Sequence, residues 1–129
     1  MKKRERLYCA ELGAGEKVVA FLPELCGTTR YWHARVASLA IERRLLLVDL
    51  LGFGRSSKPW TRYSIDRHVC AVHSVLGERG PLRLVAHSLG ALVSVAYAAR
   101  FPSQVRTLVL LSLPYFGSLD SRPGRDGAT

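Results

Sequence analysis

Four short apolar runs recur along the chain and alternate with segments of helical periodicity. The runs cover residues 17–22, 45–48, 82–86 and 105–113. The runs at 17–22 and 45–48 are almost continuously apolar, which is typical of strands that are buried on both faces, as in parallel sheets. Strands that alternate with helices build a parallel sheet with right-handed crossovers and helices on both of its faces. The sequence therefore predicts an α/β fold.

Three segments between these runs are expected to be helices. They cover residues 31–41, 65–76 and 89–100. The apolar face of the second comprises Ile65, Val69, Val72 and Leu76. Ser64 is a suitable N-cap for this helix, and Pro102 stops the third one. Residues 7–12 could form one further strand.

The composition divides the chain into three parts. Residues 1–6 are a charged leader, and 7–116 are expected to form one small domain. Residues 117–129 have no periodicity and few apolar groups, which is typical of a disordered tail. The 48% of hydrophobic and 22% of charged residues fit a globular chain.

The net charge of +9 raises the question of an anionic partner, since basic chains can bind nucleic acids or membranes. The basic residues are scattered, however. Their one dense run, at residues 2–6, lies at the N-terminus without a nucleic-acid-binding motif. We therefore expect neither nucleic acid nor a membrane as a partner.

The number and spacing of the cysteines indicate in which cellular compartment the protein is expected. Cys9, Cys26 and Cys70 form neither a CxxC pair nor an even set for disulfides, which is typical of reduced thiols in a cytoplasmic protein. Cys70 falls in an expected helix and is predicted to be buried and inert. No apolar leader follows the basic N-terminus, and no apolar run is long enough to span a bilayer.

The strongest chemical signal is Val-Ala-His-Ser-Leu-Gly at residues 85–90, between an expected strand and an expected helix. A serine hydroxyl becomes a good nucleophile only when it is exposed and a base removes its proton. A sharp strand-to-helix turn exposes Ser88, and the small neighbours Ala86 and Gly90 permit such a turn. The N–H of Leu89, at the positive end of the helix, could then donate to a developing oxyanion. The alternative is that Ser88 merely caps the helix.

Further motifs occur in the same order as in a known family. Residues 49–56 read Asp-Leu-Leu-Gly-Phe-Gly-Arg-Ser, a D-x-x-G-x-G-x-S loop, and precede the turn at Ser88. Tyr-Ala-Ala-Arg-Phe-Pro at 97–102 and Leu-Val-Leu-Leu at 108–111 follow it. From about residue 18 to residue 116 the chain resembles the α/β-hydrolases, which include esterases, lipases and cofactor-free haloperoxidase-like enzymes.

The resemblance implies a role for several residues. Ser88 is the nucleophile, and the backbone N–H groups of Leu89 and Leu25 form the oxyanion hole. Asp49, Gly52 and Gly54 are structural, like Ala86 and Gly90 of the elbow. A serine at this position argues against the dehalogenase and epoxide-hydrolase branches, which place an aspartate there. No metal and no cofactor is implied, and the partner is a small ester-like substrate.

The chain departs from the family pattern at three places. Ala86 replaces the first glycine of G-x-S-x-G, and it is still small. Pro23 and Glu24 stand where the family commonly has His-Gly, and Glu24 is expected to alter the backbone that carries the Leu25 donor. After Ser88 the only acidic residues are Asp120 and Asp126, and no histidine follows His87.

A triad in this fold needs an acid and a histidine after the serine. His87 is expected to point elsewhere, and His33, His68 and His73 lie on expected helices. We therefore expect a partial α/β-hydrolase sheet without its last strands and lid, from a serine hydrolase lineage truncated before its acid and histidine. Two alternatives remain: a catalytically inactive fragment, and a binding module of the same fold. The apolar strand at 105–113 could serve self-association through an exposed sheet edge.

Overall fold

A computed structural model describes residues 6–24, 29–59 and 63–114 of the 129-residue chain. Its elements are β1 (Cys9–Leu12), β2 (Val18–Leu22), α1 (Thr29–Val36), a 3₁₀ turn (Ala37–Ile41), β3 (Arg44–Val48), α2 (Ile65–Leu76), β4 (Leu82–His87), α3 (Leu89–Arg100), a second 3₁₀ turn (Pro102–Gln104) and β5 (Val105–Leu111). The expected leader at 1–6 and tail at 117–129 lie almost wholly outside these residues.

The strands form one sheet in the order β1-β3-β2-β4-β5. Neighbours among β2, β3, β4 and β5 pair in parallel, as the alternation of strands and helices predicts. β1 pairs with β3 in the antiparallel direction, so the sheet is mixed. The short connection from β1 to β2 reverses the chain through Gly13, at φ 73°, and Gly15, at φ 127°. Because β2 to β5 run in one direction, the segments that follow them meet at one edge of the sheet.

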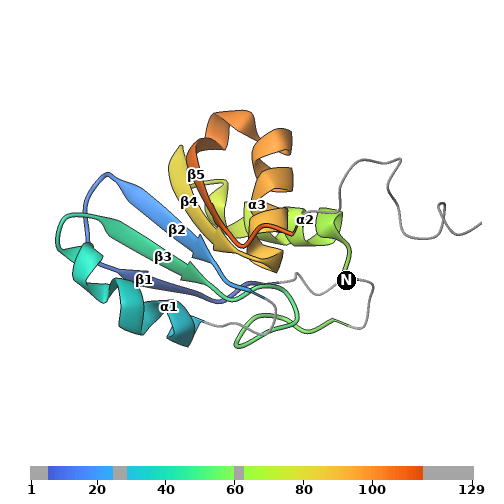
Figure 1. Ribbon diagram of the computed structural model, residues 1–129, viewed down its shortest axis with the longest axis horizontal. Coiled ribbons are helices and arrows are strands. Elements are labelled where there is room, and N and C mark those ends of the chain that lie inside the picture. The colour runs from blue at the N-terminus through green and yellow to red at the C-terminus, as the bar shows by residue number, and fades with distance from the viewer. Residues whose placement is uncertain (1–5, 25–28, 60–62, 115–129) are drawn as a thin grey trace, which may run out of the picture.

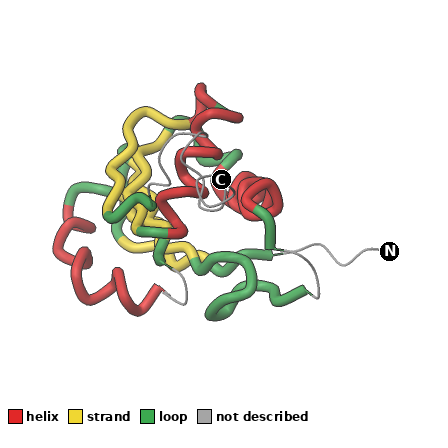
Figure 2. Tube along the Cα trace, turned by 45° about the vertical axis from the view of Figure 1, so that its right-hand side comes forward, coloured by secondary structure: helices red, strands yellow, loops and turns green. Residues whose placement is uncertain are grey.

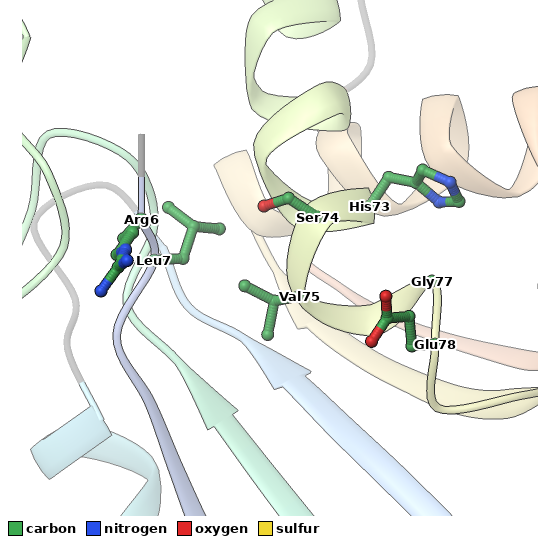
Figure 3. Close-up of a pocket in the computed structure, with 7 residues that line it drawn as sticks. All are labelled: Arg6, Leu7, His73, Ser74, Val75, Gly77 and Glu78. Atoms are coloured by element: carbon green, nitrogen blue, oxygen red, sulfur yellow. The ribbon is translucent and has the colours of Figure 1, made fainter. Parts of the chain in front are cut away.

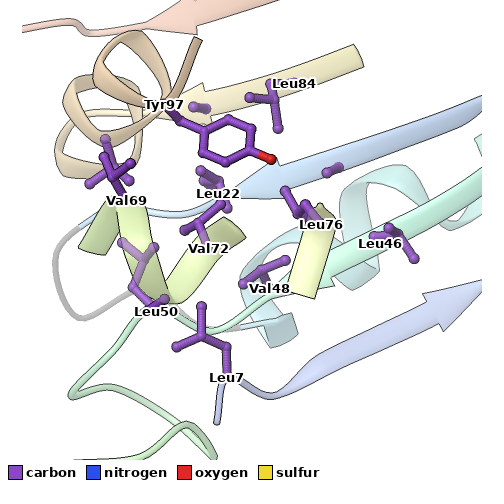
Figure 4. Packing of buried hydrophobic residues seen from close by; sticks show 14 of the residues in the cluster. Leu7, Leu22, Leu46, Val48, Leu50, Val69, Val72, Leu76, Leu84 and Tyr97 are labelled. Atoms are coloured by element: carbon purple, nitrogen blue, oxygen red, sulfur yellow. The ribbon is translucent and has the colours of Figure 1, made fainter. Parts of the chain in front are cut away.

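The sheet lies between two helical layers, with α1 on one face and α2 and α3 on the other (Figures 1 and 2). Successive side chains along a strand point to opposite faces of the sheet, so alternate residues of β2 and β3 belong to two different hydrophobic cores. The larger core packs against α2 and α3 (Figure 4), and its members include Leu22, Leu46, Val48, Leu84, Val69, Val72, Leu76 and Tyr97. The smaller core packs against α1 and consists of Val19, Phe21, Leu45, Leu47, Trp32 and Val36. Full burial of each such side chain contributes about 1.5–3 kcal/mol, which fixes the sheet between its helices.

The helix ends agree with the sequence in part. The Ser64 hydroxyl accepts the N–H of Arg67 at 3.2 Å and caps α2, as predicted. The helix expected at 31–41 changes to a 3₁₀ turn after Val36. Ile65, expected on the buried face of α2, is 36% exposed, and His68 is buried instead.

The prediction that Cys70 is buried is wrong. Cys70 lies on the exposed side of α2, where its Sγ accepts a hydrogen bond from Arg100 Nη1 at 3.4 Å. Cys9 in β1 is half-buried, and burial raises the pKa of its thiol to about 11. The expectation rested on the general tendency of free cysteine to be buried, whereas Cys70 is rotated by about 100° from Val69 around the helix and so lies outside the apolar face.

Candidate active site

Ser88 occupies a sharp turn between β4 and α3. Its backbone has φ 52° and ψ −112°, a conformation that residues other than glycine rarely adopt. Such a residue costs about 1–3 kcal/mol unless its surroundings hold it in place. The Ser88 N–H donates to the carbonyl of Leu111 at 2.9 Å, which ties the turn to the end of β5. The hydroxyl caps nothing, and the residue is partly exposed at the sheet edge.

Gly90 docks the start of α3 against the end of β2. Its N–H donates to the carbonyl of Pro23 at 3.1 Å. A Cβ at this position would lie 2.5 Å from the carbonyl oxygens of both Leu22 and Pro23. Ala86, two residues before Ser88, is fully buried beside Leu22 on the neighbouring strand. Small residues at 86 and 90 are therefore what the packing of this turn requires.

The first turn of α3 presents a backbone donor. The carbonyl of Ser88 accepts the N–H groups of Ala91 and Leu92, as at the start of an ordinary helix. The N–H of Leu89 has no backbone acceptor among the residues that the structure describes. A helix N-terminus carries a partial positive charge and readily binds anionic oxygens. The second predicted donor, Leu25, lies outside the described residues, as does Cys26.

The sequence did not reveal a contact between Glu24 and His87. His87 Nδ1 lies 3.4 Å from Glu24 Oε2, and both side chains are partly exposed. Glu24 lies two residues after Leu22 and His87 directly follows Ala86, and Leu22 and Ala86 are paired at the ends of neighbouring strands. Such an exposed pair contributes at most about 1 kcal/mol to stability. The strand register would have placed them together, had the pairing of β2 with β4 been known.

The loop at 49–56 is a rigid support at the same edge of the sheet. Asp49 is buried, and its Oδ2 accepts the N–H of Arg55 at 3.0 Å. Gly54, at φ 54°, lies so close to this carboxylate that a Cβ would collide with it. Gly52 has φ 89°, and a Cβ there would lie 2.9 Å from the Tyr63 ring. Asp49 thus stabilises the turn by accepting a backbone hydrogen bond, which agrees with the structural role that we expected for it.

Ser56 fastens the same loop to the start of the sheet. Its hydroxyl donates to the carbonyl of Asp49 and accepts the N–H of Tyr8 at 2.8 Å. Arg55 Nη1 donates to the Tyr8 hydroxyl at 3.0 Å. These bonds give Ser56 and Arg55 structural roles, away from the hydroxyl of Ser88.

The remaining histidines have surroundings of their own. His73 stacks on Phe101, with ring centroids 3.8 Å apart, and its Nδ1 lies 3.3 Å from the Tyr97 hydroxyl. His33 is exposed on α1. Within residues 6–24, 29–59 and 63–114, no hydrogen bond joins a histidine to the Ser88 hydroxyl. These contacts do not assemble a serine–histidine pair.

His68 makes stability depend on pH. Its side chain is 2% exposed, its Nδ1 has no hydrogen-bond partner in the described part of the chain, and burial lowers its pKa. The folded chain therefore protonates His68 at a lower pH than the unfolded chain, in which the pKa of the side chain has its ordinary value of 6.5. The stabilisation is fully present above that pH and is lost as the pH falls below it, by at most about 1.4 kcal/mol per pH unit for one proton.

We expect the free energy of unfolding, measured with urea between pH 7.5 and 5, to fall less steeply in His68→Gln than in the wild type. The absolute stability of that variant is not the readout, because glutamine also changes the packing. His33→Gln, on an exposed face, is the matched control and should keep the wild-type slope. Equal slopes in His68→Gln and the wild type would contradict this assignment.

A pocket of about 500 Å³ lies away from Ser88 (Figure 3). It opens between residues 6–7, which precede β1, and the C-terminal end of α2 with the turn that follows, where Leu7 faces Val75. Arg6 and Glu78 also line it, and none of its residues belongs to the turn at 86–90.

Among all the described residues, no group of three or more His, Cys, Asp or Glu side chains could hold a metal ion. No helix among them is long and apolar enough to cross a membrane.

Comparison with known proteins gives a consistent picture. Residues 17–125 match the family described as alpha/beta hydrolase fold. Lipase 3 of Moraxella sp. (strain TA144) is 34% identical over 99 residues, which are 74% of this chain and 31% of that protein. The probable lysophospholipase BODYGUARD 4 of Arabidopsis thaliana is 35% identical over 106 residues, which are 78% of this chain and 25% of that protein.

A solved structure shares the fold as well. Epoxide hydrolase VrEH1 from Vigna radiata superposes with a TM-score of 0.80 at 28% identity, over 86% of this chain and 38% of that one. The chain thus spans between a quarter and two fifths of the length of these three proteins. The family match at 17–125 includes β2 to β5 and the turn that carries Ser88, whereas β1 lies before it.

Proposed function

The chain belongs to the alpha/beta hydrolase fold family, and from this premise we propose that Ser88 is the nucleophile of a serine hydrolase acting on an ester or a related acyl substrate. One observation carries the proposal. A serine is held at φ 52° between a parallel strand and a helix, at the edge where the parallel strands end, and its hydroxyl does not cap the helix. Strained residues of this kind are typical of nucleophile elbows.

In this proposal the Ser88 hydroxyl attacks the acyl carbonyl and forms an acyl-serine intermediate, and the leaving alcohol takes up the proton. The N–H of Leu89 binds the oxyanion that develops, aided by the positive end of α3. Leu25 supplies the second donor. Removal of one such donor costs on the order of 3 kcal/mol in the activation barrier.

Turnover further requires a base that removes the proton of Ser88 and later activates water. The described histidines have other neighbours, with His87 against Glu24 and His73 against Phe101. We therefore infer that the 129-residue chain by itself turns over esters weakly. A triad enzyme without its base retains a residual acceleration of about 10³–10⁴-fold over water. The names lipase and lysophospholipase of the relatives favour a carboxylic ester as the substrate class.

Covalent labelling with a fluorophosphonate tests the role of Ser88 without requiring turnover. We expect slow labelling of the wild type, located at the peptide that contains Ser88, and none in Ser88→Ala. Ser112→Ala is the matched control, because Ser112 also has φ 52°, is exposed and follows β5 directly. It should label like the wild type. Equal labelling of the wild type and Ser88→Ala, or no labelling of the wild type after long incubation, would contradict the proposal.

A further inference from the structure

A smaller pocket lies at the opposite edge of the sheet from Ser88. It has a volume of about 220 Å³ and is built where β2, β4 and β5 begin, whereas Ser88 follows the end of β4. Because β4 has six residues, the pocket and the serine are roughly 20 Å apart. All of its lining residues belong to the described part of the chain. The charged ones are Glu16, Lys17, Arg83 and Arg106.

The strand register places Arg83 and Arg106 next to each other. Leu82 pairs with Val105 and Arg83 with Thr107, so Arg106 is an extra residue in β5. A bulge of this kind sets two residues of one strand, here Arg106 and Thr107, against one residue of its neighbour, and it turns a side chain in a new direction. Arg83, Arg106 and Thr107 are all exposed. The bulge therefore leaves two guanidinium groups on adjacent strands at one pocket.

The positive charge at this pocket is not compensated. Among the described residues, the side chains of Lys17, Arg83 and Arg106 have no ion-pair or hydrogen-bond partner, whereas Arg44 and Arg79 share one carboxylate at 3.3 Å each. Three cationic side chains and one acidic side chain give the pocket a formal charge of +2. Like charges on neighbouring strands are unfavourable, and an anion between them would replace repulsion by attraction.

We propose that this pocket binds a phosphate dianion, either free or as the head of a small phosphate monoester. The planar guanidinium groups of Arg83 and Arg106 can each offer two parallel N–H donors to phosphate oxygens, and the Lys17 ammonium adds a third charge. A phosphate monoester carries nearly two negative charges above pH of about 6, which matches the formal charge of the pocket. Pockets for drug-sized ligands usually have about 300–1,000 Å³, so this one suits a smaller anion.

An NMR titration tests the site and its location. The probes are inorganic phosphate and glycerol 3-phosphate, added to the 129-residue chain at pH 7.5 and constant ionic strength. We expect saturable shifts of the backbone amide signals of Lys17, Arg83 and Arg106, and none at Ser88. Tighter binding of glycerol 3-phosphate assigns the site to a monoester, and equal or tighter binding of phosphate assigns it to the free anion. Absence of saturable shifts at the pocket with both probes would overturn the proposal.

Removal of single charges separates the pocket from general attraction to a basic chain. Arg83→Gln and Arg106→Gln should each weaken phosphate binding about tenfold, because each removes a charged hydrogen-bond donor. Arg43→Gln is the matched control. It removes the same charge directly before β3, at the same edge of the sheet, but Arg43 does not line the pocket. The dissociation constant should hardly change in this variant. Equal weakening in all three variants would overturn the proposal.

Glu16 provides a test of the opposite sign. Glu16→Gln should tighten phosphate binding about threefold, because it removes the carboxylate that repels the anion. Asp66→Asn, an exposed site in the first turn of α2, makes the same change of charge away from the pocket and should have little effect. Circular dichroism verifies that all variants remain folded. Equal tightening in both variants would overturn the proposal. Tighter binding of a single-stranded oligonucleotide than of phosphate, with shifts far beyond the pocket, would also overturn the assignment to a small anion.

Discussion

Replacing Gly90 by alanine is expected to lower the free energy of unfolding by about 2–3 kcal/mol, although alanine is the better helix former. The new Cβ would lie 2.5 Å from two backbone carbonyl oxygens at the end of β2. Backbone atoms cannot rotate aside as a flexible side chain can, so α3 must move away from the sheet. That movement also breaks the bond from the Gly90 N–H to Pro23. Urea unfolding followed by circular dichroism measures the loss.

Gly80→Ala is the matched control, because it separates the cost of a steric clash with neighbouring atoms from the cost of an unfavourable backbone conformation. Gly80 has φ 71°, and a Cβ there would meet no atom within 4 Å. An alanine at Gly80 should cost only about 1–2 kcal/mol, from the left-handed backbone. The Gly90 variant should in addition slow the labelling of Ser88, which the Gly80 variant should leave unchanged. A Gly90→Ala chain as stable as the wild type would show that the elbow tolerates a wider turn.

The features that the sequence predicted well are those that depend on local pattern. β3 and β4 agree with the apolar runs to within one residue at each end, and α3 begins after Ser88 and ends at Arg100 as expected. Burial of β3 on both faces leaves a nearly continuous apolar run, β4 keeps an apolar run interrupted only by the exposed Arg83, and Pro102 cannot continue a helix. The sharp turn at Ser88 could likewise be predicted from a local pattern, the small residues Ala86 and Gly90 on either side of the serine.

The features that the sequence did not predict depend on the tertiary arrangement. The antiparallel direction of β1 is invisible in the sequence, because an apolar run reads the same for either direction of pairing. Burial of His68 in place of Ile65 depends on where α2 meets the sheet. The contact of Glu24 with His87 depends on β2 and β4 being neighbours, although β3 and α2 separate them along the chain.

The strained turn at Ser88 is maintained by the packing of α3. The backbone bonds of the turn reach Pro23 and Leu111, but the helix itself is fixed by side chains that enter the larger core. Tyr97 is the largest of these that is fully buried. It lies among Leu22, Val72 and Leu84 in Figure 4, about two and a half turns along the helix from the elbow. The geometry proposed for catalysis therefore depends on a residue that takes no part in the chemistry.

Tyr97→Ala is accordingly expected to lower the free energy of unfolding by about 3–5 kcal/mol, the range for removing a buried aromatic ring. The change leaves a cavity between α3, α2 and the sheet. It also removes the ring packed at 5.2 Å from Phe101 and the hydroxyl that faces His73. Unfolding in urea at pH 7.5 gives the loss directly. Labelling of Ser88 should decline in proportion to the folded fraction.

Tyr97→Phe separates the ring from the hydroxyl. It keeps the volume and loses only the contact with His73 Nδ1 at 3.3 Å, so we expect a loss of about 1 kcal/mol. A loss as large as that of Tyr97→Ala would place most of the stabilisation in the polar contact and would contradict the packing argument. A small loss in both variants would mean that the elbow is held by its backbone bonds alone. Retention of Ser88 labelling in Tyr97→Phe, with its reduction in Tyr97→Ala, would connect the packing of the core to the reactivity of the turn.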